Sequence, residues 1–342
     1  MSNPKYHHLI PRTYLRAWCH SNDSVYVVDK GKRKLETKNI NTNFGISQFH
    51  TITAGMMICE DNDLNQIFKY LDGYEIYLNN KKLSDFHEYN INYTDFDDWI
   101  IKKDSKPVSK KTKNILKSKI EQEKILEIEN LWQIKFENKW RWLRDTIEYN
   151  VLRTKSTEIN QFYKGLIMRF VVAFNWRGFY GNELFRKEYE WISDMINLDE
   201  IIIPYEERYK VYLETASVEM EHLLLLKNYR EFLRDKGIMY KMAVNYVRLL
   251  GIMFYVAGGS NNFITSDNPS FIGKFEGQSV HIFPVSPRVI VCLGKNGKNE
   301  DKYLVKKVPD RLVSMINKQI YDNCVDRIIM FDSKDNIAKS IF

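Results

Sequence analysis

The sequence contains few of the residues that break or cross-link a chain. Among 342 residues there are only eight prolines, 15 glycines and four cysteines. The cysteines lack both the close spacing of a zinc site and the density of a disulfide framework, so we expect reduced thiols in a cytoplasmic protein. No apolar run approaches the roughly 20 residues that cross a bilayer, and residues 1–8 lack the apolar core of a secretory signal. We therefore expect no membrane association and no disulfide scaffold.

The signatures of the commonest enzyme classes are also missing. There is no P-loop, no GxGxxG turn after a strand, no HExxH helix and no GxSxG elbow. The net charge of +7 is modest for this length, and it permits contact with nucleic acid without requiring it. What is abundant is apolar residues, at 44%, with 14% aromatic, which can form a large core. Composition therefore indicates a globular protein and leaves its activity open.

Residues 1–60 are predicted to form a short helix followed by a hairpin. Pro11 suits a first helical turn, and the runs 24–29 and 33–38 flank a Gly-Lys turn and have strand composition. Residues 48–53 are expected to add a third strand. Farther along, residues 61–71 are predicted to be helical.

Residues 115–256 are predicted to form a helical core. One helix is expected over 115–153, because eight apolar side chains recur there with a helical period. Further helices are expected at 158–176, 183–196, 205–235 and 240–254. Five helices with apolar stripes can bury one another, so this stretch should be a central bundle.

Residues 262–342 return to strand patterns, with one amphipathic helix at 310–321 and a last strand at 327–331. With strands at both ends and helices between them, the simplest topology pairs the N-terminal hairpin with the C-terminal strands. The predicted fold class is therefore α+β and predominantly helical, with a central helix bundle and a small antiparallel sheet built from the terminal strands. We expect a single domain over residues 1–342.

Eight lysines lie within residues 102–119, around Pro107. Such a run is typical of a solvated loop and the exposed face of a helix, and it is also compatible with an electrostatic strip that contacts phosphates.

Two short segments carry the most distinctive pattern in the chain. The first is YHHLIPRTYLRAW at residues 6–18, and the second is FITSDNP at 263–269, followed by FPVSP at 283–287. Together they resemble bacterial domain-of-unknown-function family 4238, which has an HHxxPxxYLxxF/W opening and a late SDNP element before a PxSP strand. The motif FNWR at 174–177 stands where that family tends to place a Gln-x-x-Arg helix end. The resemblance implies a fold and a site location and no particular reaction.

His7 and His8 are the first catalytic candidates, because imidazole can serve as general acid, general base or metal ligand. In extended backbone their side chains point to opposite faces, so only one would enter a site. Asp267 ends a buried apolar run and precedes Asn268-Pro269, which favours extended geometry. A catalytic carboxylate and an Asx-turn are both compatible with that position, and Asn268 is a candidate for substrate binding.

Arg12, Arg16 and Arg177 are the cationic candidates, since guanidinium donors suit phosphate oxygens. Arg177 is assigned to catalysis, and the other two to substrate binding. Glu129 is either the partner of such an arginine, which we favour, or a further acid that could join a metal site.

These residues suggest a nuclease or another enzyme acting on phosphoesters, of a bacterial defence or toxin-like system. His7 or His8 would be the base or a metal ligand, and Asp267 the paired carboxylate. A divalent metal and a nucleic-acid partner are compatible with this set, and so is action on a small nucleotide. The alternative is a non-enzymatic binding or regulatory protein with a protein partner or a homo-oligomeric state. Its His-Asp and Arg-Glu bonds would then form a structural seam.

Overall fold

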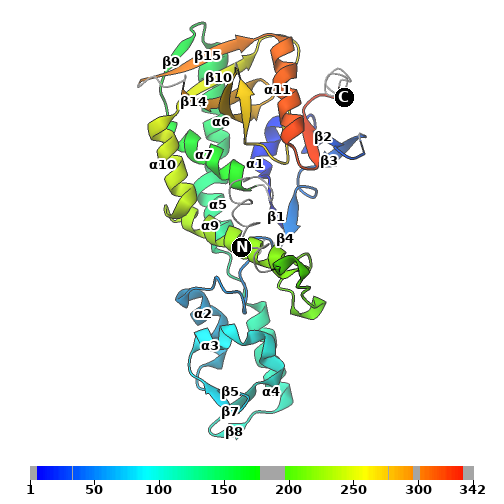
Figure 1. Cartoon of the computed structure of the whole chain (residues 1–342), viewed down its shortest axis with the longest axis vertical. Helices are drawn as coiled ribbons and strands as arrows, with labels where there is room; N and C mark the ends of the chain where they lie inside the picture. The colour runs from blue at the N-terminus through cyan, green and yellow to red at the C-terminus, as the bar shows by residue number, and fades with distance from the viewer. Residues whose placement is uncertain (1–5, 33, 178–196, 276, 296–300, 334–342) are drawn as a thin grey trace. The chain divides into compact units, whose positions relative to one another are not determined.

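The computed structural model describes residues 6–32, 34–177, 197–275, 277–295 and 301–333 (Figure 1). The chain divides into two compact units, each built from separate stretches of sequence. The first unit comprises residues 1–49, 131–186 and 231–342, and the second unit comprises residues 50–130 and 187–230. Among the helices that the structure describes, none is both long and apolar enough to span a bilayer.

A six-stranded sheet forms the largest layer of the first unit. In spatial order its strands are β12 (Phe271–Phe275), β13 (Gln278–Ser286), β14 (Val289–Gly294), β10 (Gly251–Ala257), β15 (Lys302–Val308) and β9 (Glu158–Asn160). Neighbouring strands are antiparallel except β10 and β15, which run parallel. All six residues of β14 are buried. Such a continuous apolar run is expected where both faces of a sheet are covered.

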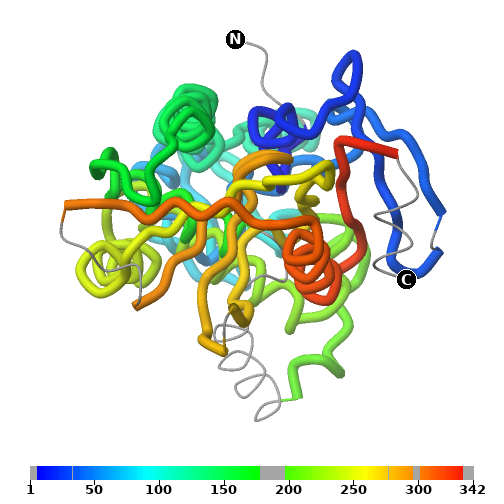
Figure 2. Tube along the Cα trace, turned by 90° about the horizontal axis from the view of Figure 1, so that it is seen from above, coloured from blue at the N-terminus to red at the C-terminus, as the bar shows by residue number. Residues whose placement is uncertain are grey.

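A four-stranded antiparallel sheet joins the two ends of the chain. Its order is β11 (Thr265–Ser266), β16 (Arg327–Met330), β2 (Ser24–Asp29) and β3 (Leu35–Asn39). Val28 of β2 lies opposite Ile328 of β16, and Figure 2 shows this red strand beside the blue hairpin. The predicted hairpin and its pairing with a C-terminal strand are confirmed.

Helices cover the sheets of the first unit. They include α1 (Arg12–Leu15), α6 (Asn138–Arg153), α7 (Lys164–Arg177), α10 (Gly237–Leu249) and α11 (Asp310–Asn323). α11 buries Ile316 and Ile320 in the same apolar cluster as Ile282 of the six-stranded sheet. Each such side chain contributes about 1.5–3 kcal/mol when it is removed from water. The predicted helix at 310–321 is confirmed.

The second unit has a small sheet and short helices. Its elements are α2 (Asp61–Phe68), η2 (Lys69–Leu71), β5 (Glu75–Leu78), β6 (Lys81–Leu83), α3 (Phe86–Ile91), η3 (Tyr93–Asp98), β7 (Ile100–Lys103), β8 (Lys106–Pro107), α4 (Lys110–Gln122), η5 (Leu198–Glu200), η6 (Tyr205–Glu207) and the first part of α9 (Ala216–Leu233). The sheet order is β6-β5-β7-β8. Asn79 and Asn80 close the β5–β6 hairpin with φ of 49° and 64°, the left-handed geometry that asparagine tolerates and tight hairpin turns require.

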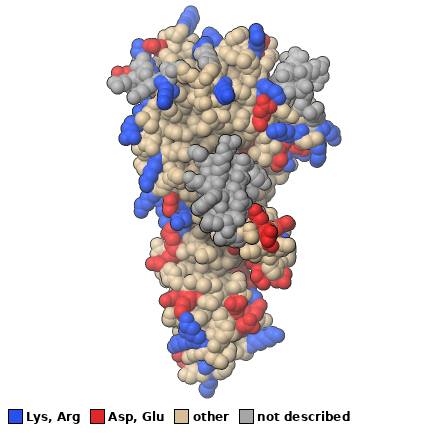
Figure 3. All heavy atoms as spheres, viewed as in Figure 1, with Lys and Arg blue, Asp and Glu red and all other residues tan. Residues whose placement is uncertain are grey.

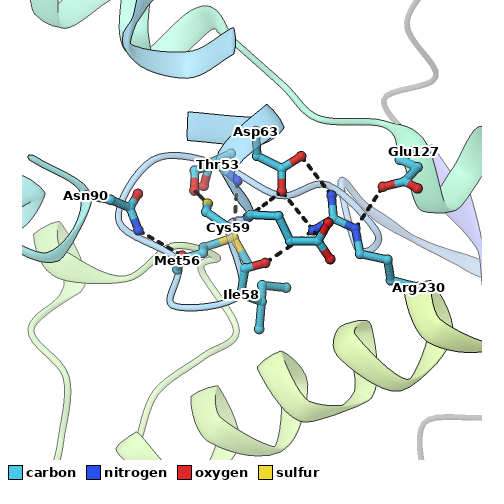
Figure 4. A network of polar contacts seen from close by, with 9 residues as sticks. Thr53, Met56, Ile58, Cys59, Asp63, Asn90, Glu127 and Arg230 are labelled. Atoms are coloured by element: carbon cyan, nitrogen blue, oxygen red, sulfur yellow. Dashed lines mark hydrogen bonds and ion pairs between the residues drawn. The ribbon is translucent and has the colours of Figure 1, made fainter. Parts of the chain in front are cut away.

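A buried arginine ties the second unit together, as Figure 4 shows. The Arg230 guanidinium lies 2.7 Å from Asp63 and 2.8 Å from Glu127, and it also donates to the carbonyl of Ile58. Arg230 is 3% exposed and Asp63 is 6% exposed. A buried charge of this kind is tolerated because it is paired and hydrogen-bonded.

The predicted fold class is wrong. Over the residues that the structure describes, the fold is 45% helical and 26% strand, with four sheets, one of them six-stranded, and not a helix bundle with one small sheet. The helix predicted at 240–254 ends at Leu249, and β10 follows it. β10 is buried along nearly its whole length, so it shows no alternation of apolar and polar residues that would mark it as a strand.

Other boundaries were also predicted wrongly. The helix expected at 115–153 is divided into α4, α5 (Glu127–Trp132), a π-helical turn at Gln133–Glu137 and α6. The third strand expected at 48–53 is absent from the described residues there, and β4 (Gly45–Ser47) precedes it. The helix expected at 183–196 lies outside the described residues. The single domain stays a prediction, because the division into two compact units does not show whether either folds alone.

Candidate functional site

The two histidines of the N-terminal motif lie on β1 (Tyr6–His8), which pairs with β4. His7 is buried and His8 is half-buried, so their side chains differ in environment, as alternation along a strand requires. The Nε2 atom of His8 lies 3.1 Å from the carbonyl oxygen of Ile40. Because a carbonyl only accepts, Nε2 of the neutral ring carries the proton and Nδ1 holds the lone pair.

Tyr14 connects this motif with the late segments of the chain. Its hydroxyl lies 2.7 Å from Oγ1 of Thr265 and donates to the carbonyl of Pro284 at 2.9 Å. The ring is completely buried and packs against Phe283 and Phe174. The N-terminal motif and the late motif therefore meet, which confirms that the two chain ends fold together.

Arg177 lies at the end of α7 and is 2% exposed. It donates to the backbone carbonyl of His8 at 2.9 Å and to Oε1 of Glu137 at 2.7 Å. Its guanidinium also stacks over Trp132, 4.8 Å from the ring centroid. Its Nε has no acceptor among the described residues. A cavity of about 10 Å³, the room of one water molecule, is lined by Arg177 and Glu137.

The charges around His8 favour its neutral form. Burial lowers the pKa of the imidazole below its ordinary value, and the positive charge of Arg12 lowers it further. Arg177 acts in the same direction, whereas Glu137 and the Ile40 carbonyl oppose it. His8 is therefore unprotonated at neutral pH and can accept a proton.

The two arginines of the N-terminal motif have different partners. Arg12 is exposed and donates from Nη1 to Oδ1 of Asn41 at 3.1 Å. Arg16 lies 3.7 Å from Asp23, and both side chains are exposed. Arg12 thus belongs to the surroundings of His8, while Arg16 forms a solvated surface pair of small energetic effect.

Asp267 has a different environment from His8. One of its oxygens accepts the backbone N–H of Val325 at 2.9 Å, and the other accepts those of Asp326 and Arg327 at 2.6 and 3.0 Å. Burial raises its pKa, while these three N–H groups oppose the rise. The side-chain amide of Asn268 donates to the carbonyl of Asn323. Both side chains therefore hold the turn between α11 and β16.

Glu129, for which an arginine partner was expected, contacts a histidine. In the second unit, Oε2 of Glu129 lies 2.6 Å from Nδ1 of His50, and His50 is completely buried. His50 is not among the candidates that the sequence indicated. An imidazole and a carboxylate are both ligand types for divalent metals, but two side chains do not make a complete site. Metal binding thus stays a proposal.

Glu137 and Asn175 are the site residues that sequence reasoning missed. Glu137 ends the π-helical turn Gln133–Glu137, an irregularity that is frequent at functional sites and has no sequence signature. Asn175 donates to the carbonyl of Ser270 at 2.9 Å, beside the late motif. Asn175 stands one position after the place where the Gln-x-x-Arg pattern puts its amide, and this shift obscured its role.

The lysines of residues 102–119 have mostly intramolecular contacts. Lys113 donates to the carbonyls of Asp97 and Trp99, and Lys117 lies 2.7 Å from the Asp97 carboxylate. On the face seen in Figure 3, many of the Lys and Arg side chains lie next to acidic or uncharged surface. These contacts are those of an ordinary solvated surface.

A family model described as "Protein of unknown function (DUF4238)" matches residues 6–335, which is nearly the whole chain. The chain belongs to this family. The match includes the N-terminal motif, Arg177 and the late SDNP segment, so the family sequence covers all the elements that build the site around His8. No curated protein and no solved structure matches the chain.

Proposed function

We propose that the first unit carries a site that acts on phosphoesters, most specifically as a nuclease on RNA or DNA. The observation that carries the proposal is the neutral His8 imidazole next to two guanidinium groups, those of Arg12 and Arg177. Cleavage of a phosphoester needs a general base that accepts a proton and positive charge that stabilises the phosphoryl oxygens, and this site offers both.

In this proposal the Nδ1 atom of His8 accepts the proton of the attacking water or hydroxyl. Arg12, which is exposed, binds the phosphate of the incoming substrate. Arg177 is 2% exposed, so it acts through its positive charge, which favours the negative charge that grows on the nearby phosphoryl oxygens. Glu137 holds Arg177 in place by its 2.7 Å ion pair and is a positioning residue.

Asp267 favours the second candidate function, a binding or regulatory protein in which the motif is a structural seam. Its two oxygens already accept three backbone N–H groups, a contact set that leaves little room for proton transfer. In this alternative the Arg177–Glu137 pair would likewise fix the fold, and the partner would be a protein or a second copy of the chain.

One experiment separates the two functions. The purified protein is incubated with labelled RNA, single- and double-stranded DNA, nucleotides and bis(p-nitrophenyl) phosphate, with Mg²⁺, with Mn²⁺ and with chelator. His8→Ala is compared with His87→Ala, which changes an exposed histidine of the second unit. A catalytic His8 predicts at least a hundredfold loss in the first variant, no loss in the control, and similar melting temperatures.

Loss of activity only together with loss of folding would instead support the structural seam. Expression of the intact chain and the His8→Ala variant in a bacterial host tests the toxin-like role, since only an active nuclease should slow growth. If both proteins are equally harmless while the purified protein cleaves nucleic acid, the toxin-like role is refuted and the nuclease is not.

A further inference from the structure

The second unit has a cavity of about 230 Å³ that the proposed phosphoester site does not use. η3, the end of α4 and the segment 206–209 form its walls. This volume is below the roughly 300–1,000 Å³ of sites for drug-sized ligands, so its occupant is a small molecule. The side chains that matter for its chemistry are Tyr93, Glu121, Lys124, Glu206 and Glu207.

Two hydrogen-bond donors in this lining have no acceptor among the residues that the structure describes. The hydroxyl of Tyr93 is buried and has no partner among the described residues. Lys124 is half-buried, and its ammonium makes no hydrogen bond or ion pair with any described residue. Burial lowers the pKa of Lys124, and the negative charge of Glu121 opposes this. Unpaired buried donors are costly, so an anionic group placed between them would be stabilised.

Carboxylates occupy other positions of the same lining. Glu121, Glu206 and Glu207 are exposed, and none forms an ion pair within the described part of the chain. The cavity therefore offers unpaired groups of both signs, which suits a ligand that carries both charges.

We propose that this cavity binds a small zwitterion of the amino-acid class. Its carboxylate accepts from the Lys124 ammonium and the Tyr93 hydroxyl, and its ammonium faces the carboxylates of Glu206 and Glu207. The site lies wholly in the second unit, so it is independent of the activity proposed for the first.

Lys210 is a second buried amine that interacts electrostatically with Lys124. It is 7% exposed and donates to the carbonyl of Thr51 at 3.1 Å. Burial, together with the charge of Lys124, lowers its pKa to about 7. No carboxylate of the described residues forms an ion pair with either amine, so a bound carboxylate would favour their charged forms.

Isothermal titration calorimetry of the full chain tests the proposal. The panel contains the 20 standard L-amino acids and, for each that binds, the amine without its carboxylate and the acid without its amino group. Inorganic phosphate is a further arm. We expect at least one amino acid to bind at millimolar concentration or tighter, and both truncated analogues and phosphate to bind at least tenfold more weakly.

Lys124→Met and Tyr93→Phe remove one donor each with little change of shape. Each should weaken binding about tenfold or more, the effect of losing a charge-assisted hydrogen bond. The matched controls are Lys119→Met, an exposed lysine of α4, and Tyr149→Phe, an exposed tyrosine of the first unit. Circular dichroism checks that all four variants fold.

The proposal is overturned if no amino acid binds, if the deaminated acids or phosphate bind as well as the amino acids, or if folded Lys124→Met and Tyr93→Phe retain full affinity.

Discussion

Replacing Asp267 by Asn is the sharpest test of how the late motif works. The change keeps the size of the side chain but turns one acceptor oxygen into an NH₂ donor. In the native protein one oxygen accepts one backbone N–H and the other accepts two, with N···O distances of 2.6–3.0 Å. The amide can serve only one of these two groups of donors, so at least one backbone N–H loses its acceptor.

The expected cost follows from these contacts. A hydrogen bond to a charged acceptor contributes about 1.5–3 kcal/mol, and a buried donor left unpaired costs about 1–3 kcal/mol. Because Asp267 is only partly shielded from water, we expect a loss of about 2–4 kcal/mol in the free energy of unfolding. At roughly 2–4 °C per kcal/mol, the melting temperature should fall by about 5–15 °C.

Thermal melting followed by circular dichroism measures this loss. Asp322→Asn is the matched control, because Asp322 is an exposed carboxylate of α11 that pairs with Lys318 one turn away. It should change the melting temperature by about 1 °C, since such pairs contribute roughly 0.3–0.5 kcal/mol. If Asp267→Asn melts like this control, the structural reading of Asp267 is refuted and its catalytic role regains support.

Three further predictions concern other buried polar groups. Glu137→Gln removes the charge that compensates Arg177, so urea unfolding should show a loss of about 3–5 kcal/mol, and a loss below 1 kcal/mol would contradict the buried pair. Arg230→Met leaves the buried Asp63 carboxylate unpaired and should cost a similar amount, again by urea unfolding, unless the Arg230 network is not formed in solution. Burial lowers the pKa of His281 to about 4. Between pH 6.5 and pH 4 the unfolded state therefore binds more protons than the folded state, so the stability of the folded protein falls as the pH drops through that window. His281→Phe should reduce the stability difference between pH 7 and pH 4 by about 3 kcal/mol, and an unchanged difference would show that His281 is not buried in its neutral form.

Local sequence patterns predicted the elements that have one exposed face. The hairpin at 24–38 has strand composition on both sides of a Gly-Lys turn, and helix α11 has a clear amphipathic period; both were predicted correctly. β10 was not, because a strand buried on both faces loses its alternation and continues the apolar run of the preceding helix. The π-helical turn at 133–137 had no sequence signal, since it changes hydrogen bonding without changing composition.

The candidate site was predicted in part. The sequence identified His8, Arg12 and Arg177, because an imidazole and guanidinium groups suit phosphate chemistry and the residues fall in the family motifs. It could not identify the ion-pair partner of Arg177, since Glu137 is one of many surface-type glutamates until the fold brings it within 2.7 Å. The same holds for Asp267, whose partners at 325–327 are backbone groups about 60 positions away in the sequence.

The pH dependence of phosphoester cleavage tests the central claim most directly. If His8 is the base, the rate should fall on the acid side with an apparent pKa below the ordinary value of about 6.5, because burial and Arg12 lower the pKa of this imidazole. In His8→Gln that acid limb should disappear together with most of the rate. A protein that cleaves no phosphoester at any pH, or a His8→Gln variant that keeps both the rate and the acid limb, would contradict the account.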